Sequence, residues 1–311
     1  MDKAIFTLSL DCEGLWGVAD NDAVIDSGCI NQASLTQAYS FIRETLDKHQ
    51  LKATAAFVTC FAVDPEVVMA QRSLLGELQK VNPRWFRRIS KTLDLGVLDG
   101  WSGAPFFKSL QRDRHEMAWH GTTHQSLADS ATEEAIALEM ELTQHLWGAL
   151  DQEPRSVVFP RNVVGQLERL RGLGLLAYRA APSRSGGRLG RLLSLASEFN
   201  VFDRGVSDRP FHSSGWDVLP AGHFLNWPAG LRRLVPPRAT LMRWRSLLEA
   251  AVETRGYVHM WFHPHNLITA PAMAYLFDGV LGMVAERVKA GEMLCLPMGQ
   301  ITEVGSQGVQ R

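Results

Sequence analysis

Two histidines, His120 and His124, stand four residues apart just after the apolar run Met117-Ala118-Trp119. Imidazoles at this spacing can bind one metal ion if the backbone between them makes a single helical turn. The spacing alone is a weak signal, because two solvated loop histidines would look the same. Three further polar clusters also close apolar runs, and they lie at 11–13, 159–162 and 263–265. Polar residues at the ends of several strands are typical of a barrel whose active site collects strand ends.

The first of these clusters contains two carboxylates. Asp11 and Glu13 are two residues apart at the end of a predicted strand, so both side chains can lie on one face. Two carboxylates beside two imidazoles allow one acid to bind a metal ion while the other acts as a base. Solvated loop acids, or a helix N-cap, are the alternative interpretation of the same residues.

The composition is that of an ordinary globular protein of 311 residues, with 46% hydrophobic and 21% charged residues. A formal net charge of -1 argues against a nucleic-acid partner, which needs a basic surface. No stretch approaches the ~18 apolar residues of a membrane span, and no signal peptide is visible at the start of the sequence. We therefore expect a cytoplasmic protein.

Short apolar runs alternate with longer segments of helical period. The predicted strands are 4–11, 53–63, 116–119, 156–159, 176–179, 216–219, 257–262 and 293–296. The predicted helices are 32–48, 65–79, 132–150, 166–173, 187–197, 241–254 and 271–289, with a short helix and a long loop in 81–109. Such alternation implies parallel pairing. We predict an α/β fold, a distorted (β/α) barrel of about seven parallel strands, with 1–311 as one catalytic domain.

The segment from about 225 to 245 is the one anomaly in composition, because it is both basic and apolar. Tryptophan and leucine side chains can lie at a membrane interface while arginine meets phosphate. We expect a membrane- or substrate-facing insertion, and an ordinary loop that leads into an amphipathic helix is the alternative. The residues in question are Trp227, Leu231, Arg232, Arg233, Leu234, Arg243, Trp244 and Arg245.

The polar clusters together resemble the motifs of the polysaccharide deacetylases, the carbohydrate esterases with a NodB homology domain. The segment 8–14, Leu-Ser-Leu-Asp-Cys-Glu-Gly, is similar to the acidic pair that closes the first strand in that family. The segment 114–127 matches the motif His-Ser/Thr-x-x-His together with its flanks. The segments 158–162 and 260–266 stand in place of the arginine-proline and late histidine motifs. The resemblance covers almost the whole chain in the right order and implies a NodB-type barrel.

The resemblance implies a role for each matched residue. Asp11 would be the general base and His263 the general acid. Glu13, His120 and His124 would bind a divalent metal ion, which we expect to be zinc because its sites favour nitrogen ligands.

Two departures from the family pattern leave alternatives open. Cys12 separates two acids that are adjacent in the family, so the roles of base and metal ligand could be exchanged. Arg161, the expected orienter of the base, follows its proline instead of preceding it. His265 could also replace His263 as the acid. The side chains expected to contact substrate are Trp16, Asn162, Trp216 and His265.

This set of residues predicts a metal-dependent hydrolase that removes an acetyl or formyl group from an amino sugar. Because no export signal is visible, we expect a cytoplasmic sugar nucleotide or a lipid-linked sugar at the inner membrane face as the substrate. A metal-free cyclic-amide hydrolase of the same superfamily and a non-catalytic carbohydrate-binding protein are the alternatives. The sequence does not fix the oligomeric state.

Overall fold

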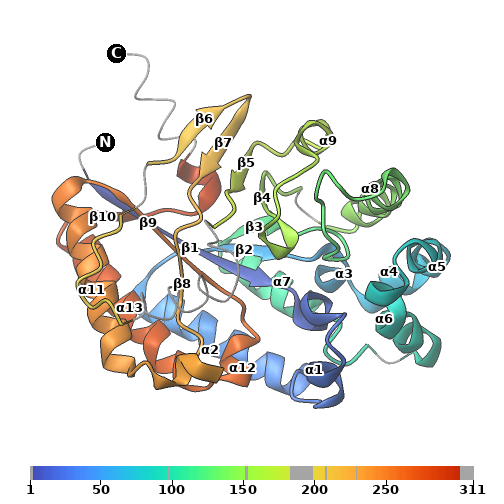
Figure 1. Ribbon diagram of the computed structural model, residues 1–311, viewed down its shortest axis with the longest axis horizontal. Helices are drawn as coiled ribbons and strands as arrows, with labels where there is room; N and C mark the ends of the chain where they lie inside the picture. The colour runs from blue at the N-terminus through green and yellow to red at the C-terminus, as the bar shows by residue number, and fades with distance from the viewer. Residues whose placement is uncertain are drawn as a thin grey trace.

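The computed structural model describes residues 3–96, 98–150, 153–182, 199–206, 209–228 and 230–301. These residues form a ten-stranded sheet with the order β6-β7-β5-β4-β3-β2-β1-β9-β8, and β10 pairs with β1 (Figure 1). The pairs are parallel except for β6 and β7, which are antiparallel. The strands are β1 Ala4–Cys12, β2 Thr54–Phe57, β3 Glu116–Trp119, β4 Ser156–Val158, β5 Ala177–Arg179, β6 Phe211–Ser213, β7 Trp216–Leu219, β8 His223–Phe224, β9 Tyr257–Phe262 and β10 Met293–Cys295.

The sheet bends into a distorted barrel, because β7 and β8, which are close together in the chain, lie near its two opposite edges. β7 pairs with β5, β8 pairs with β9, and only the residues 220–222 separate β7 from β8. The predicted α/β barrel is therefore confirmed. The count of about seven strands was too low for the described residues, because β6 is exposed and β8 has only two residues, so neither gives a buried apolar pattern.

Helices cover the outside of the sheet, with α11 and α13 on one side of the molecule and α4, α5 and α6 on the other (Figure 1). The α-helices are α1 Asp22–Asp26, α2 Gln32–His49, α3 Thr59–Ala62, α4 Pro65–Ala70, α5 Arg72–Val81, α6 Pro83–Leu95, α7 Ala104–Arg112, α8 Glu133–Trp147, α9 Leu167–Gly172, α11 Pro237–Thr254, α12 Asn266–Thr269 and α13 Ala272–Lys289. Three short 3-10 helices are η1 Gly14–Val18, η2 Pro160–Asn162 and η3 Gly230–Leu234. None of the described helices is both long and apolar enough to cross a membrane.

Three predicted elements were wrong in detail. The strand expected at 53–63 ends at Phe57, and the short helix α3 follows it. The helix expected at 65–79 is two helices, α4 and α5. The stretch 81–109 contains α6 and α7 instead of one short helix and a long loop, because its prolines stand in the first turns of those helices. The helix predicted at 187–197 lies outside the described residues.

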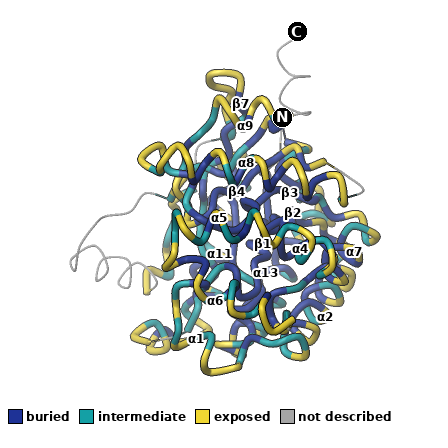
Figure 2. The backbone as a smooth tube through the Cα atoms, turned by 90° about the vertical axis from the view of Figure 1, so that its right-hand side faces the viewer, coloured by how far each residue is buried: buried dark blue, intermediate teal, exposed yellow. Residues whose placement is uncertain are grey.

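The alternation of side chains along β1 separates two environments. All nine residues of β1 are buried. One set of β1 side chains, which includes Ile5, points into the barrel. There it meets apolar side chains from the other strands, among them Ala56, Ala118, Val158, Ala177, Leu219 and Tyr257. The other set packs against the surrounding helices. Figure 2 shows that β1 to β4 form a buried centre inside more exposed helices.

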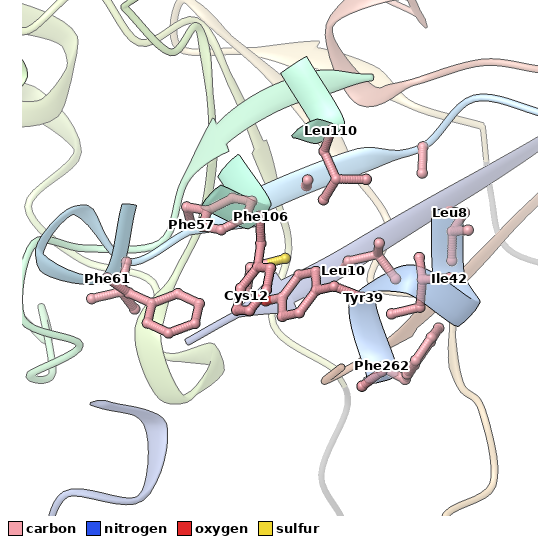
Figure 3. Close-up of a cluster of buried hydrophobic side chains, with 14 of the residues drawn as sticks. Leu8, Leu10, Cys12, Tyr39, Ile42, Phe57, Phe61, Phe106, Leu110 and Phe262 are labelled. Carbon is pink, nitrogen blue, oxygen red and sulfur yellow. The ribbon is translucent and has the colours of Figure 1, made fainter. Parts of the chain in front are cut away.

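The outer face of β1 carries a dense aromatic cluster next to Cys12 (Figure 3). Tyr39 of α2 stacks on Phe106 of α7 with ring centroids 4.4 Å apart. Burial raises the pKa of the Cys12 thiol well above its usual value, so this cysteine stays a neutral packing group. The packing fixes the outer face of β1 and thereby the direction in which its inner residues point.

Candidate active site

The carboxyl ends of β1 and β3 bring one acid and two histidines together. The Glu13 Oε2 atom lies 2.8 Å from His124 Nε2 and 3.2 Å from His120 Nε2. All three side chains are buried, and their ligand atoms are close enough together to hold a metal ion. Glu13 follows β1 and His120 follows β3, so the end of each strand supplies one side of the cluster.

The backbone between the two histidines is a loop and not a helical turn. Gly121 and His124 both have left-handed backbone angles, with φ of 75° and 61°. A side chain at Gly121 would come within 2.7 Å of Pro160, so only glycine fits there. The loop nevertheless directs both imidazoles toward Glu13, as a helical turn would.

The carboxylate of Glu139, on α8, accepts four hydrogen bonds from this loop and the residue after it. One carboxylate oxygen accepts from the backbone N–H groups of Thr122 and Thr123, at 2.8 and 2.9 Å. The other accepts from the Thr123 hydroxyl at 2.7 Å and from the Gln125 amide at 3.0 Å. Burial raises the pKa of Glu139, and these bonds partly offset that effect. Sequence reasoning missed this residue, because nothing separates it from the other glutamates of the same helix.

Hydrogen bonds orient the ring of His120 for ligation. Its Nδ1 lies 2.7 Å from the carbonyl oxygen of Val158, so Nδ1–H donates and Nε2 faces Glu13. Burial would lower the pKa of His120, but Glu13 and Asp11 raise it, so this ring must give up a proton when it binds a metal ion. Burial lowers the pKa of His124 despite the nearby carboxylate, which favours the neutral ring that a metal ligand requires. Trp85 packs beside His124, with ring centroids 5.8 Å apart, and fixes its plane.

The first turn after β1 leaves space for the Glu13 carboxylate. A Cβ atom at Gly17 of η1 would overlap the carboxyl group of Glu13, so glycine is needed there. Burial would raise the pKa of Glu13, but the neighbouring imidazoles, His124 and His263 foremost, hold it well below its usual value. The acid is therefore ionised when it faces the imidazoles.

Asp11 is paired with an arginine that the sequence analysis did not select. Arg179 Nη1 donates to Asp11 Oδ1 at 2.8 Å, and Nη2 donates to Oδ2 at 2.7 Å. Asn162 Oδ1 accepts a third bond from Nη2 at 2.8 Å. Burial would raise the pKa of Asp11, but the guanidinium lowers it below the usual value. Asp11 is thus a buried carboxylate that stays ionised.

Arg161, expected to orient the base, has other partners. It donates to Asp20 at 2.8 Å and lies over the Trp85 ring at 4.5 Å, and its side chain is 43% exposed. The expectation was wrong because Arg161 lies in the turn η2, after β4 has ended. Arg179 closes the predicted strand 176–179, so the strand-end criterion applied to the other clusters would have found it.

A directed chain of hydrogen bonds supports Arg179 from inside the barrel. His259 Nδ1 lies 3.1 Å from the Pro220 carbonyl oxygen, so this nitrogen is the donor. His259 Nε2 then accepts from the Ser9 hydroxyl at 2.8 Å, and Ser9 Oγ accepts from Arg179 Nη1 at 2.9 Å. Burial lowers the pKa of His259 to about 3, which keeps it neutral. The chain thus holds Nη1, the same nitrogen that donates to Asp11.

The two late histidines lie opposite the first pair, on the other oxygen of Glu13. His263 Nε2 is 3.6 Å from Glu13 Oε1 and 3.8 Å from Asp11 Oδ2. His265 Nδ1 is 3.7 Å from the same Glu13 oxygen, and the two rings stack with centroids 5.2 Å apart. The side chain of His263 is 25% exposed, against 9% or less for the other members, so the site opens on its side.

Two tryptophans expected to contact substrate belong to the core, so that expectation was wrong. Trp16 and Trp216 are each 1% exposed. The Trp16 indole donates to the Trp101 carbonyl at 3.0 Å. Trp216 alternates to the outer face of β7 and packs on Tyr178 at 5.6 Å. Asn162 binds Arg179, as described above, and so belongs to the support of Asp11.

The segment 225–245 is only partly a surface insertion. Trp244 is fully buried, and Arg243 donates to Asp203 at 2.9 Å, so neither faces a membrane. In η3, by contrast, Leu231 is 64% and Leu234 is 63% exposed. This short helix follows β8, whose Phe224 ring lies 5.9 Å from that of His263, so it lies on the side of the barrel where the site opens.

No family model matches the chain, and no curated protein matches it significantly. A protein from Mycobacterium smegmatis assigned as a polysaccharide deacetylase has a similar crystal structure, with a TM-score of 0.61 at 14% identity over 99% of this chain and 92% of that one. The chain therefore has the NodB-type fold of the polysaccharide deacetylases, and the resemblance of the motifs is confirmed at the level of the fold.

Two further solved structures are more distant. A peptidoglycan deacetylase from Bacillus subtilis gives a TM-score of 0.45 at 10% identity, over 98% of this chain and 93% of that one. A family 4 carbohydrate esterase from Streptomyces lividans, solved with acetate, gives 0.40 at 12% identity, over 95% and 93%.

Proposed function

We propose that the protein is a metal-dependent hydrolase that removes an N-acyl group from an amino sugar. One observation carries the proposal: a carboxylate and two imidazole nitrogens converge beside a second, ionised carboxylate. The donor set fits a divalent ion such as zinc, because the bond from Nδ1 to Val158 aims the Nε2 atom of His120 at Glu13. Glu13, His120 and His124 would hold the ion.

An ion at that position would supply a positive charge that acidifies water and polarises an acyl carbonyl. The remaining chemistry belongs to the side chains. Asp11, kept ionised and oriented by Arg179, accepts the proton of the attacking water. His263, which lies 3.8 Å from Asp11, donates a proton to the amine as the C–N bond breaks. Water adds one hydroxyl to the acyl carbon, so the products are a free acid and an amino sugar.

Metal analysis and an amine-release screen test this function together. We expect about one zinc ion per chain and amine release from acetylated or formylated amino sugars.

Asp11→Asn should keep the metal and lose turnover, because an amide accepts no proton. His124→Ala should lose most of the metal while the fold is retained. A reversed pattern in Asp11→Asn and Glu13→Gln would exchange the roles of base and ligand, and metal-independent amine release would favour the cyclic-amide hydrolase.

We further propose a lipid-linked amino sugar at the inner membrane face as the substrate. The support is the exposed pair Leu231 and Leu234 in η3, beside the exposed Arg233, on the side where the site opens. Apolar side chains can enter the interface while a basic residue near an anionic surface contributes about 1 kcal/mol.

Co-sedimentation with anionic vesicles tests this substrate class. We expect binding that weakens with salt and is lost in Leu231→Asp plus Leu234→Asp. The matched control is Tyr275→Asp, at an exposed site on α13, which should still bind. Equal rates on a water-soluble sugar nucleotide and its lipid-linked counterpart, without vesicle binding, would contradict the proposal and leave the deacylase function standing.

A further inference from the structure

Glu13 lies between two pairs of imidazoles, with one pair at each carboxylate oxygen. Oε2 faces the Nε2 atoms of His120 and His124. Oε1 faces His263 Nε2 at 3.6 Å and His265 Nδ1 at 3.7 Å. The donor atoms of Glu13, His263 and His265 are close enough together to hold a metal ion, as are those of the first trio. The same carboxylate therefore serves two candidate positions.

Two observations point to a cation as the partner of this second trio. His265 Nδ1 is buried, faces Glu13 and has no hydrogen-bond partner among the described residues. His263 Nδ1 faces Asn266 Oδ1, which also accepts from the backbone N–H of His263, both at 3.2 Å. Nδ1 is thus a donor, and in the neutral ring the Nε2 lone pair points at carboxylate oxygens. A lone pair and a carboxylate attract each other only through a cation between them.

The spacing of the donor atoms suits a small divalent ion. Neighbouring ligands on a tetrahedral zinc ion lie about 3.3 Å apart when its bonds are ~2.0 Å long. The separations from Glu13 Oε1, 3.6 Å to His263 and 3.7 Å to His265, are slightly wider. A shift of a few tenths of an ångström in each side chain would bring them to that value.

We propose that Glu13, His263 and His265 form a second divalent-cation site, which fills only at excess metal and inhibits the enzyme. The inhibition rests on the proposed function, in which His263 Nε2 gives a proton to the leaving amine. A cation ligated by that nitrogen takes the place of the proton. The second ion binds more weakly than the first, because both ions share Glu13 and because Arg179 already neutralises Asp11.

Equilibrium dialysis of the full chain against increasing zinc, followed by metal analysis, tests the site without a substrate. The parent protein should rise from about one bound ion to about two. His265→Ala should stop at about one ion, because it keeps only the first trio. His145→Ala removes an exposed histidine on α8 and should still reach the parent plateau. A parent plateau at one ion, or a second ion retained in His265→Ala, would overturn the proposal.

An activity measurement over the same zinc range tests the inhibition. Amine release by the parent should fall with the midpoint at which the second ion binds, and whatever rate His265→Ala retains should not fall there. Two bound ions without a loss of rate would contradict the inhibition. One bound ion with amine release intact would leave the proposed function standing without this site. Two bound ions without amine release from any substrate would leave the site standing without that function.

Discussion

The carboxylate of Asp11 depends on Arg179 for both its charge and its direction. The two parallel bonds between them, at 2.8 and 2.7 Å, are the bidentate geometry that only arginine provides. Both side chains are 1% exposed or less. A buried carboxylate without its partner costs about 3–5 kcal/mol, so the pair is coupled to stability as well as to the proposed chemistry.

Arg179→Lys tests this coupling, because lysine keeps the charge but cannot make two parallel bonds. We expect kcat/KM to fall by roughly 100-fold, since a misplaced base lies outside the geometry of attack. The pKa of Asp11 should rise, because lysine stabilises the carboxylate less well. A base must be deprotonated to act, so the acid limb of the pH–rate profile should move to higher pH.

Arg161→Lys is the matched control for this prediction. Arg161 is partly exposed and pairs with Asp20, so its variant should keep the parent profile. If the Arg161 variant moved the acid limb and the Arg179 variant did not, the original expectation from the arginine-proline motif would be restored.

At the residue level the sequence indicated most of the cluster but not its support. Asp11, Glu13, the first histidine pair and the late histidine pair all follow or close apolar runs, and strand ends meet at one edge of a parallel barrel. Arg179 closes its predicted strand and could have been selected by that criterion, whereas His259 lies within its strand, where a polar residue gives no sign of which strand it will face. Their contacts depend on the register between strands far apart in the chain.

At the level of elements, α8 positions the metal-binding loop through Glu139. The four donors that surround this carboxylate come from residues 122–125, the segment that ends the His120–His124 motif. Because His124 has a left-handed backbone angle, φ of 61°, the loop needs outside support to keep it there.

Glu139→Gln should therefore weaken metal binding although Glu139 touches no metal ligand atom. The amide NH₂ of glutamine would face donors from the loop instead of accepting from them. Residues that orient metal ligands typically contribute 10–100-fold in affinity, and we expect a loss of about that size. Competition with a chelator would measure it. Glu141→Gln, at an exposed site on the same helix, should leave the affinity at the parent value, and equal affinities in both variants would contradict the role of Glu139.

Element boundaries were predictable where local signals were strong. The strands 116–119, 216–219 and 257–262 were predicted with the observed limits. The strand 53–63 was predicted too long, because Val58 to Val63 is apolar but turns into α3, where Thr59 and Cys60 donate to Gly121 and Thr122. These contacts are non-local, so the apolar run could not reveal where the strand ends.

At the scale of the whole molecule, buried polar groups lie at both ends of the apolar barrel interior. Glu116 lies at one end, bonded to Thr54 and Ser156, and the pair of Asp11 and Arg179 lies at the other. The interior tolerates these groups because Glu116 accepts hydrogen bonds from Thr54 and Ser156, and Asp11 is paired with Arg179. Protonation of a buried histidine such as His259, which supports Arg179 through Ser9, should therefore destabilise the fold.

The pH dependence of stability follows from buried histidines. Burial lowers the pKa of His259 to about 3, and that of His115 and of His265 to about 4, from an ordinary 6.5. A group whose folded pKa is lowered contributes its stability fully above its unfolded pKa and loses it as pH falls towards the folded value. His120 has the opposite sign, because its nearby acids raise its pKa. The pKa values of His124 and His223 are also lowered by burial. Five lowered histidines outweigh one raised histidine, so the free energy of unfolding should fall between pH 6.5 and 4.5.

His259→Asn isolates one of these contributions, since asparagine can still donate and accept but does not titrate. Below pH 6.5 each such histidine contributes at most about 1.4 kcal/mol per pH unit to the slope. Urea unfolding at several pH values would give the free energy of unfolding for the variant and the parent. The variant should be less stable near neutral pH, because it loses the hydrogen-bond geometry of His259 with Ser9 and Pro220. Its free energy of unfolding should nevertheless change less steeply with pH, by up to about 1.4 kcal/mol per pH unit. The groups that both proteins share cancel in the difference between the two slopes. A slope equal to that of the parent would show that His259 is already charged in the folded barrel, and the directed chain from Pro220 to Arg179 would then be wrong.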